Sequence, residues 1–297
     1  MHKHKFALEA SVIIRSGTEI LKKNDNPSSS LDSRILLGHA MGLDRSVYPH
    51  ENIDITQEEI KAFKKLIKER QNGKPVSRIV SKKEFWKMIF TIDETTLDPR
   101  PDSEVIIQTI LNHFINKSKK LRVLDLGSGS GCLGLSILDE YKKAEAVFFD
   151  TSKKSLKMVK LNALSHKLYE RAKFVHMNWF DKKWDEKIFK IIKHTKFDII
   201  IANPPYIPSN QIKDLEVEVK KFEPTLALDG GDDGLESYRC IIPKIKKILA
   251  LEGKFFIEIG KDQENLINQI ANSNNLFYKE SNKDLSGITR VLVYGLK

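Results

Sequence analysis

Residues 121–134 read LRVLDLGSGSGCLG, an apolar run that passes into closely spaced glycines. LRVLDL has the length and composition of a short buried strand. Gly127, Gly129 and Gly131 allow the backbone to turn tightly and to approach a ligand closely. The helix that we expect after them offers N–H groups that have no partner inside the helix. The stretch therefore predicts a strand, a ligand-binding loop and a helix in succession.

Strand and helix signals alternate along the rest of the chain. Four further apolar segments have strand character: AVFFD (146–150), FVHM (174–177), FDIIIA (197–202) and KFFIEI (254–259). Because strands that are apolar throughout are typical of sheets covered on both faces, we expect an α/β fold with a parallel sheet. The last two segments, LFYKE (276–280) and RVLVYGL (290–296), are joined by a short polar connection, which favours an antiparallel pair at the sheet edge.

The first 80 or so residues have helical periodicity. Thr56–Glu59 is a capping box, apolar residues recur behind it at helical spacing, and Asn72-Gly73 supplies a stop. Alternate residues of FWKMIFTI (85–92) have strand spacing, and Ser103 or Asp102 is expected to cap the helix that follows. We therefore predict a helical domain over residues 1–80, a β-hairpin or linker over 81–102, and the α/β domain over 103–297.

The composition is that of a globular protein in a reducing compartment. The net charge is +10, but the lysines are scattered in short pairs, so the charge alone does not indicate a nucleic-acid partner. Neither Cys132 nor Cys240 belongs to a C-x-x-C pair, so we expect no disulfide framework and no metal site. We find neither a secretory signal nor the roughly 20 apolar residues of a membrane span, and we expect a cytoplasmic location.

Two acidic residues at strand ends narrow the choice of ligand. Gly129–Gly134 matches G-x-G-x-x-G, so a dinucleotide is one alternative, although a lone match is weak. Asp125 lies two positions before Gly127, where a carboxylate would repel a pyrophosphate and would suit the cationic amino group of S-adenosylmethionine. Asp150 ends the second strand and can accept both ribose hydroxyls, although it could instead cap the next helix. We predict a site for S-adenosylmethionine.

The fourth strand of this region ends on Asn203-Pro204-Pro205-Tyr206. Ligands bind at the carboxyl edge of open α/β sheets, so Asn203 is expected near the glycine loop if the two strands are neighbours. The prolines stiffen the turn, the Asn203 side chain and the Pro204 carbonyl supply two acceptors, and Tyr206 supplies an aromatic face. This arrangement suits a planar –NH2 group, whose nitrogen could attack a sulfonium methyl held in line with it. We favour this catalytic role over that of a proline-stiffened surface turn.

Together these motifs resemble the class I S-adenosylmethionine-dependent methyltransferases that act on exocyclic or amide nitrogen. Further segments are similar to those of the HemK/PrmC family, the peptide chain release factor N5-glutamine methyltransferases. They are KPVSRIVSKKEFW (74–86), TTLDPRPDSE (95–104), FEPTLALDGGDDGLESYR (222–239) and DLSGITRVL (284–292). The resemblance covers nearly the whole chain. It implies a Rossmann-like, mostly parallel seven-stranded sheet with an antiparallel edge strand, preceded by a small all-α N-terminal domain.

The same resemblance implies roles for individual residues. The residues that would bind S-adenosylmethionine are Asp125, Gly127, Ser128, Gly129, Ser130, Gly131, Asp150, Trp179 and Asn203. Trp179 would lie against the adenine and Asp150 would hold the ribose. The catalytic residues would be Asn203, Pro204, Pro205 and Tyr206, which would grip the glutamine amide of the GGQ motif of a release factor. The helical domain and the hairpin would help to dock that partner. Residues 222–224 and 229–231 could form a loop on the substrate side or only a structured turn.

Two residues depart from the family pattern. Asn178 stands where the family usually has an acid, which implies at most weaker cofactor binding, and Ser81 stands where it usually has glycine. Three alternatives to the release-factor function are a ribosomal-protein glutamine methyltransferase, a nucleic-acid adenine or guanine amino methyltransferase that flips its base, and a non-catalytic cofactor-binding scaffold. The intact Asp125, Asn203 and Tyr206 argue against the scaffold. We see no added recognition domain, and expect neither direct nucleic-acid binding nor membrane binding.

Overall fold

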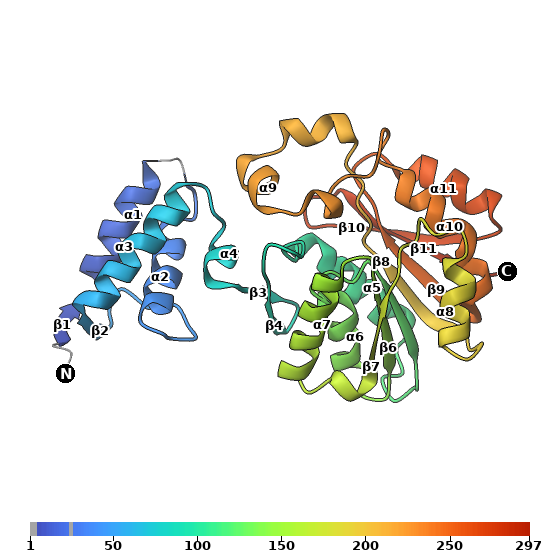
Figure 1. Ribbon diagram of the computed structural model, residues 1–297, viewed down its shortest axis with the longest axis horizontal. Helices are drawn as coiled ribbons and strands as arrows, with labels where there is room; N and C mark the ends of the chain where they lie inside the picture. The colour runs from blue at the N-terminus through green and yellow to red at the C-terminus, as the bar shows by residue number, and fades with distance from the viewer. Residues whose placement is uncertain (1–4, 24–25) are drawn as a thin grey trace. The chain divides into compact units, whose positions relative to one another are not determined.

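The computed structural model describes residues 5–23 and 26–297 and divides into two compact units. The N-terminal unit comprises the chain up to residue 82 together with residues 217–222, and the sheet unit comprises residues 83–216 and 223–297 (Figure 1). The chain therefore passes between the units after residues 82, 216 and 222. Residues 1–4 and 24–25 of the predicted helical domain lie outside the described residues.

The N-terminal unit is mostly helical. Its elements are β1 (Lys5–Glu9), α1 (Ala10–Lys22), α2 (Ser29–Ala40), β2 (Asn52–Thr56), α3 (Gln57–Gln71), α4 (Val76–Val80) and α9 (Val217–Phe222). Apolar side chains of α1, α2 and α3, such as Ile14, Leu37 and Phe63, form one buried cluster. This cluster is the small bundle core that the helical periodicity predicts.

Strands β1 and β2 form an antiparallel pair that the expectation of an all-helical unit missed. Each strand has only five residues, and each runs directly into a helix. In β2, Ile53 and Ile55 are buried while Asn52 and Asp54 are exposed, which is the two-residue period of a strand. So short a run is easily taken for the lead-in to the capping box of α3.

Helix α3 begins and ends as the sequence predicts. The Oγ1 of Thr56 accepts the N–H of Glu59 at 3.2 Å, and a Glu59 carboxylate oxygen accepts the N–H of Thr56 at 2.7 Å. These reciprocal bonds complete the capping box. At the other end Asn72 is the C-cap and Gly73 follows with a φ of 86°. A left-handed residue at this position is the usual way for a helix to stop.

An arginine ties α9 to the N-terminal unit. Arg70, in the last turn of α3, donates from Nε to Asp32 Oδ2 at 2.7 Å and from Nη1 to Glu218 Oε1 at 2.6 Å. Its side chain is only 10% exposed, so both ion pairs are shielded from solvent on the arginine side. This contact explains why a six-residue helix belongs to the N-terminal unit although the chain on either side of it belongs to the sheet unit.

The sheet unit is an α/β fold. Its elements are β3 (Lys82–Phe85), β4 (Met88–Thr91), η1 (Pro101–Ser103), α5 (Glu104–His113), β5 (Arg122–Leu126), α6 (Cys132–Glu140), β6 (Glu145–Asp150), α7 (Lys153–Ser165), η2 (Tyr169–Arg171), β7 (Ala172–His176), α8 (Trp184–Ile191), β8 (Phe197–Ala202), η3 (Ser209–Asp214), η4 (Thr225–Ala227), α10 (Glu236–Ile248), β9 (Leu249–Glu258), α11 (Glu264–Ser273), β10 (Phe277–Lys283) and β11 (Thr289–Gly295). The η segments are short 3-10 helices, and β3 pairs with β4.

The seven strands of the main sheet lie in the order β10-β11-β9-β8-β5-β6-β7. The five consecutive strands from β9 to β7 in this row are parallel to one another. Strand β11 runs antiparallel to both of its neighbours, β9 and β10. The predicted fold class, a mostly parallel seven-stranded sheet with an antiparallel strand near its edge, is confirmed. Strand β8 lies directly beside β5, which is the neighbour relation that the Asn203 prediction required.

Helices cover both faces of the sheet. Helices α5, α6 and α7 lie on one face and α8, α10 and α11 on the other (Figure 1). Alternate residues of β8 serve the two cores: Ile199 and Ile201 pack in the cluster with α5 to α7, whereas Ile200 packs in the cluster with α10. Burial on both faces explains why these strands are apolar throughout.

The start of α5 differs from the sequence expectation. Ser103 occupies the N-cap position, but in the described part of the chain neither its side chain nor that of Asp102 makes a capping hydrogen bond. The single 3-10 turn η1, which begins at Pro101, leads into the helix instead. The Ser103 hydroxyl is therefore available to a residue elsewhere in the fold.

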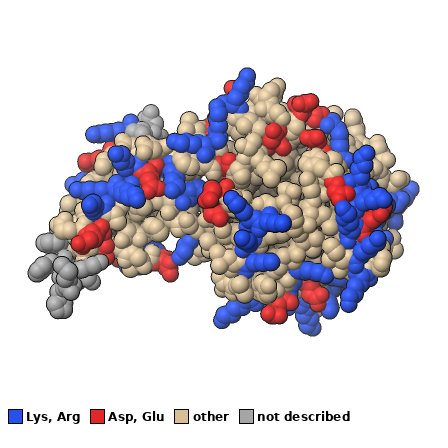
Figure 2. Space-filling view, in the orientation of Figure 1, with Lys and Arg blue, Asp and Glu red and all other residues tan. Residues whose placement is uncertain are grey.

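The basic charge of the chain is interspersed with acid. On the face shown in Figure 2, acidic side chains lie among the lysines and arginines over much of the surface. Such alternation reduces the field that a run of like charge would produce. Within the described ranges, no helix is long and apolar enough to cross a bilayer.

Ser81 gives the first testable prediction. It ends α4 in the left-handed region, with φ 55° and ψ 30°, which costs a residue with a Cβ about 1 kcal/mol. We expect Ser81→Gly to stabilise the N-terminal unit by about 0.5 kcal/mol, because glycine removes this strain but gains freedom in the unfolded chain. Urea denaturation followed by circular dichroism measures the change.

Gly73 is the matched control for Ser81. Its φ is also positive, and a Cβ there would meet only Val217 Cγ1, at an ordinary 3.8 Å. Gly73→Ala should therefore destabilise the unit by about 1 kcal/mol through backbone strain alone. A Ser81→Gly variant that is less stable than the parent would contradict this account of the α4 end.

Candidate active site

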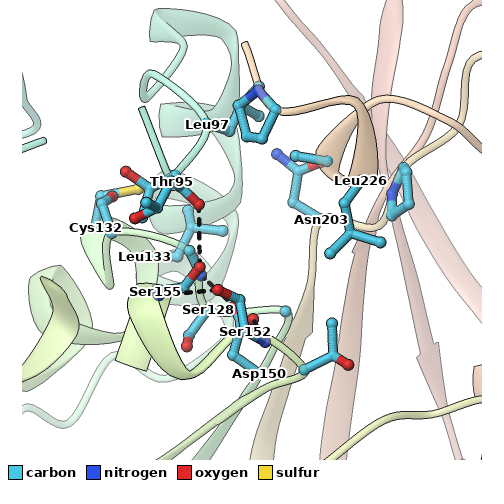
Figure 3. Close-up of a pocket in the computed structure, with 18 of the residues that line it drawn as sticks. Thr95, Leu97, Ser128, Cys132, Leu133, Asp150, Ser152, Ser155, Asn203 and Leu226 are labelled. Carbon is cyan, nitrogen blue, oxygen red and sulfur yellow. Dashed lines mark hydrogen bonds between the residues drawn. The ribbon is translucent and has the colours of Figure 1, made fainter. Parts of the chain in front are cut away.

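A cavity of about 450 Å³ lies at the carboxyl edge of the central strands, a size typical of small-molecule sites. Its walls include the residues that follow β5, β6 and β8, which are adjacent and parallel. In Figure 3, Asn203 and Leu226 lie across the cavity from Thr95 and Cys132, and Asp150 lies below them in this view. The sheet thus brings segments that are distant in the sequence to one ligand-sized space.

The glycine loop after β5 turns as tightly as the sequence predicts. Gly127, Gly129 and Gly131 have φ values of 74°, 54° and 84°, in the region that favours glycine. The N–H of Gly127 donates to the carbonyl oxygen of Phe149 at 2.8 Å, which ties the loop to β6. A Cβ on Gly127 would lie only 2.9 Å from the Trp179 ring. Both the conformation and the close packing therefore require glycine at this position.

Asp150 ends β6 and is 7% exposed. Its Oδ2 accepts the N–H of Gly129 at 2.9 Å and its Oδ1 accepts the N–H of Ser152 at 2.8 Å. Ser152 is the N-cap of α7 and accepts the N–H of Ser155, so the alternative in which Asp150 caps this helix is wrong. Burial raises the pKa of Asp150. Because a carboxylate has about four acceptor sites, Asp150 can still accept hydroxyl groups from a ligand.

Trp179 combines core packing with a place in the cavity wall. Its ring stacks parallel to that of Phe149, with an interplanar angle of 4° and centroids 6.2 Å apart. The Trp179 Nε1 is buried and has no hydrogen-bond partner among residues 5–23 and 26–297. A buried indole N–H normally finds a partner, so this unsatisfied donor is an exception among buried polar groups. Asn178 also lines the cavity, and its Oδ1 accepts the N–H of Phe180 at 2.9 Å.

Asp125 lies beneath the glycine loop and not in the cavity wall. It is 1% exposed, and its Oδ2 accepts the N–H of Gly134 in α6 at 3.0 Å. Burial raises the pKa of Asp125 to about 7, although the Gly134 hydrogen bond lowers it. The carboxyl group faces α6 and not the cavity. It would therefore repel a pyrophosphate in the cavity less than its position in the sequence predicts. Its contact with a cationic amino group stays a prediction.

The turn after β8 divides between the cavity and the core. Asn203 and Pro205 line the cavity, and the Asn203 Nδ2 donates to the Oγ of Ser103 at 3.3 Å. Pro204 is buried outside the lining, and Tyr206 packs against the core cluster that includes α10. Burial raises the pKa of Tyr206 to about 12, so its hydroxyl stays protonated at neutral pH and remains a hydrogen-bond donor.

Most of the residues predicted from the sequence come together in this cavity. Those that line it are Gly127, Ser128, Gly129, Ser130, Asp150, Trp179, Asn203 and Pro205. Asp125, Gly131, Pro204 and Tyr206 lie outside the lining. Gly131, Pro204 and Tyr206 each adjoin a lining residue in the chain, whereas Asp125 lies two positions before Gly127, the first lining residue of the glycine loop.

No place in the site was predicted for residues 95–100, and residues 222–224 and 229–231 were expected to form either a substrate-side loop or a structured turn. Residues 95–100 and 224–229 both contribute to the lining of the cavity, from outside the sheet. Glu223 joins them, because its carboxylate accepts the N–H of Asp98 at 3.1 Å and an N–H of Arg100 at 3.2 Å. Ser103 and Glu258 were also missed as site residues. A signal for Glu258 exists, since it is a lone acid in the otherwise apolar segment FFIEI.

Comparison with known proteins decides the family. The release factor glutamine methyltransferase of Caulobacter vibrioides is 35% identical over 92% of this chain and 90% of its own length. The chain belongs to the release factor glutamine methyltransferase family. It is therefore an enzyme, and the predicted membership of the HemK/PrmC family is confirmed. Residues 101–219 match the methyltransferase small domain, and residues 13–80 match the PrmC N-terminal domain.

Two other relatives agree with this family. The release factor glutamine methyltransferase of Bradyrhizobium diazoefficiens is 34% identical over 89% of this chain and 87% of that protein. The bifunctional methyltransferase of Rickettsia felis is 30% identical over 95% of this chain, which spans only 57% of that longer protein. A release-factor-specific protein-(glutamine-N5) methyltransferase structure from Alicyclobacillus acidocaldarius covers 67% of this chain and 94% of its own at 22% identity, with a TM-score of 0.42. So low a score adds nothing to the family assignment.

The cavity fits the methyl donor of such an enzyme. The glycines permit close approach of a ligand, Trp179 offers a flat apolar surface, and Asp150 retains acceptor sites. The Ser128 Oγ, like the Trp179 Nε1, is buried without a hydrogen-bond partner in the described part of the protein. Both residues line the cavity, but these two atoms are buried beneath its surface.

Asp150 provides a direct test of this fit. We expect Asp150→Ala to weaken S-adenosylmethionine binding by roughly 10- to 100-fold, the usual cost of losing hydrogen bonds to a charged group. Isothermal titration calorimetry measures the affinity. Asp139→Ala is the control, because Asp139 lies in α6 outside the cavity lining, where it pairs with Lys142, and its loss should leave the affinity unchanged. Equal binding by both variants would remove Asp150 from the cofactor site.

Proposed function

We propose that this enzyme transfers the methyl group of S-adenosylmethionine to the side-chain amide nitrogen, N5, of the glutamine in the GGQ motif of peptide chain release factors. One observation carries the chemical part of this proposal: Asn203 and Pro205 line the same cavity as the glycine loop and Asp150. The names of the relatives support the choice of substrate.

The cofactor side of the cavity is held by the central strands. The glycine loop and Ser128 would enclose S-adenosylmethionine, Asp150 would accept its ribose hydroxyls, and Trp179 would face the adenine. When bound, the cofactor supplies an electrophilic methyl group on a sulfonium. The protein's task is then to place an acceptor nitrogen in line with that methyl group.

The substrate side has to make an unreactive nitrogen reactive. An amide nitrogen is a poor nucleophile because its lone pair is delocalised into the carbonyl. The Oδ1 of Asn203 and the carbonyl oxygen of Pro204 would accept the two N–H groups and localise the lone pair. No base has to act before methyl transfer, since the methylated nitrogen is strongly acidic. Tyr206 fits this scheme as a neutral contact, because its raised pKa, about 12, prevents it from acting as a base.

The remaining parts of the proposal concern the partner and its compartment. We assign docking of the release factor in part to the N-terminal unit, which matches the PrmC N-terminal domain. A cytoplasmic location is consistent with Cys132 and Cys240, which are both free thiols. We assign no direct role to nucleic acid or membrane.

A methyl-transfer assay tests the substrate. The enzyme is incubated with labelled S-adenosylmethionine and a release factor, a ribosomal protein or RNA, and the release factor alone is expected to acquire label. A release factor with the GGQ glutamine replaced by alanine should acquire none. Asn203→Ala should abolish transfer while retaining the fold, because the substrate –NH2 loses a side-chain acceptor. Label only in RNA or in the ribosomal protein would establish one of the alternative functions.

Asn178 offers a gain-of-affinity test. The Asn178 side chain is an amide at the position where family members usually have an acid, and one of its acceptor sites is used by Phe180. We expect Asn178→Asp to tighten S-adenosylmethionine binding by about 3- to 10-fold, because a carboxylate accepts an adenine N–H more strongly than an amide does. Calorimetry on the two proteins compares them, and weaker binding by the aspartate variant would contradict contact with the adenine edge.

A further inference from the structure

A buried carboxyl group lies beside the Asn203 amide. Strands β8 and β9 are parallel, and Ala202 pairs with Ile257, so Asn203 and Glu258 are the next residues along the two chains. Neighbouring residues of a parallel pair face the same side of a sheet. Phe256 packs in the core beneath α5 to α7, and Glu258, two positions later, faces that same side. Neither the cofactor site nor the substrate clamp proposed above uses this carboxyl group.

Ser103 completes a cluster of three side chains. Serine at a helix N-cap normally accepts an N–H from the first turn of its own helix, but the Ser103 side chain makes no such bond. Its Oγ instead accepts the Nδ2 of Asn203 at 3.3 Å, from 100 positions away in the sequence. A helix-capping hydroxyl has thus been redirected toward the residue that is proposed to hold the substrate.

Glu258 is deeply buried and only partly satisfied. It is 3% exposed, and its Oε2 has no hydrogen-bond partner among the described residues. Burial raises the pKa of Glu258 to about 7, against hydrogen bonds from Ser103 and Asn203 that lower it. An orphaned carboxylate oxygen is costly in a protein interior. A purely structural role would be served at lower cost by a neutral or apolar side chain.

The direction of the hydrogen bonds in this cluster follows from the chemistry of its members. An ionised carboxylate can only accept, so the single hydrogen of the Ser103 hydroxyl is directed to Glu258. The lone pairs of that hydroxyl then face Asn203 and can bind only its –NH2 end. Without such a constraint the two ends of an asparagine amide are nearly interchangeable in shape.

We propose that Glu258 and Ser103 are positioning residues that fix the orientation of the Asn203 amide, so that its Oδ1 is the end presented to the substrate nitrogen. The inference rests on the proposed function, because the substrate must offer an –NH2 group. A reversed Asn203 would present –NH2 to –NH2, and the substrate would lose its acceptor. Glu258 acts through Ser103 and Asn203 and does not itself touch the reacting atoms.

The proposal makes turnover depend on the ionisation of Glu258. Once protonated, the carboxyl group can donate to Ser103, which frees the hydroxyl hydrogen for the Oδ1 of Asn203. Turnover should therefore rise with pH through the pKa of Glu258, about 7. The other titratable or charged groups whose fields couple to that of Glu258 are Asp102 in η1, Cys132 in α6, Tyr206 after β8, Tyr238 in α10 and Arg290 in β11. The pKa values of Cys132, Tyr206, Tyr238 and Arg290 are all raised from values already well above 7, so none of these four titrates near neutrality.

Asp125 must be separated from Glu258 in such an experiment, because its pKa is also about 7. It lies under the glycine loop, so its titration is expected to affect cofactor binding. Measurement of kcat at saturating S-adenosylmethionine between pH 6 and 8 reduces that contribution. Comparison with a variant that lacks only the Glu258 charge then isolates the effect of Glu258.

The experiment compares Glu258→Gln with the parent enzyme in the release-factor assay. Glutamine keeps the shape but can donate as well as accept, so the orientation of Asn203 is no longer fixed. We expect kcat to fall by roughly 10- to 100-fold, which corresponds to an unpaired buried polar group, and S-adenosylmethionine affinity to fall by less than kcat does. The rise of kcat with pH near 7 should disappear in this variant. A normal kcat with a normal pH profile would overturn the proposal.

Three further variants exclude a merely structural explanation. Ser103→Ala should lower kcat as Glu258→Gln does, and Ser103→Thr should recover most of that loss because it restores the hydroxyl. Asp185→Asn is the control for neutralising a buried acid, since Asp185 is 1% exposed in α8 and pairs with Lys247 at 2.9 Å. It should leave kcat and its pH profile unchanged, and an equal effect of Asp185→Asn would refute a specific role for Glu258.

The parent enzyme separates this inference from the proposed function. If the parent transfers no label to the release factor, the proposed function fails, and the positioning role falls with it. If the parent transfers label and Glu258→Gln and Ser103→Ala both match it, the positioning role alone fails. Calorimetric binding of S-adenosylmethionine, which needs no turnover, shows whether each variant retains its folded cofactor site.

Discussion

The parallel pairing of β5 with both β6 and β8 is the constraint on which the site depends. Val123 lies opposite Ala146 on one side and opposite Ile199 on the other, so all three strands end together. A slip of one residue in either pair would turn every side chain to the opposite face of the sheet. The register that builds two apolar cores therefore also decides that Asn203 faces Ser103, and that Asp150 reaches the backbone of the glycine loop.

Three carboxyl groups in and around the cavity are held away from water. Asp125, Asp150 and Glu258 are all buried, and burial raises the pKa of each. A nearby positive charge is the usual remedy for such groups, because it favours the ionised form that burial disfavours. Of these three, only Asp150 lines the cavity, whose other charged lining residues are Asp229, Arg100 and Lys154. The charge around the cavity is therefore mixed, and a preference for a positively charged group is local to the carboxyl groups.

The sequence was most informative about features that depend on the residue type at one position and on its near neighbours in the chain. The left-handed glycines of the loop, the capping box of Thr56 and the apolar strands were predictable because each depends on near neighbours in the chain. The redirected hydroxyl of Ser103 was not, because its partner lies 100 positions away and helix capping is the usual local use of serine. The β1–β2 pair was missed for a related reason, since only pairing across 40 or more residues makes two such short strands stable.

Helix α9 makes the N-terminal unit discontinuous in sequence, with Arg70 of the first segment bound to Glu218 of the inserted one. A protease that nicked the backbone between residues 82 and 83 would cut only one of the three crossings between the units. The severed N-terminal fragment would still bind α9, which remains covalently joined to the sheet unit at both of its ends. The same topology means that neither fragment is a complete structural unit. Residues 1–82 alone lack α9, and residues 83–297 contain α9 without the helices of the N-terminal unit to which it belongs.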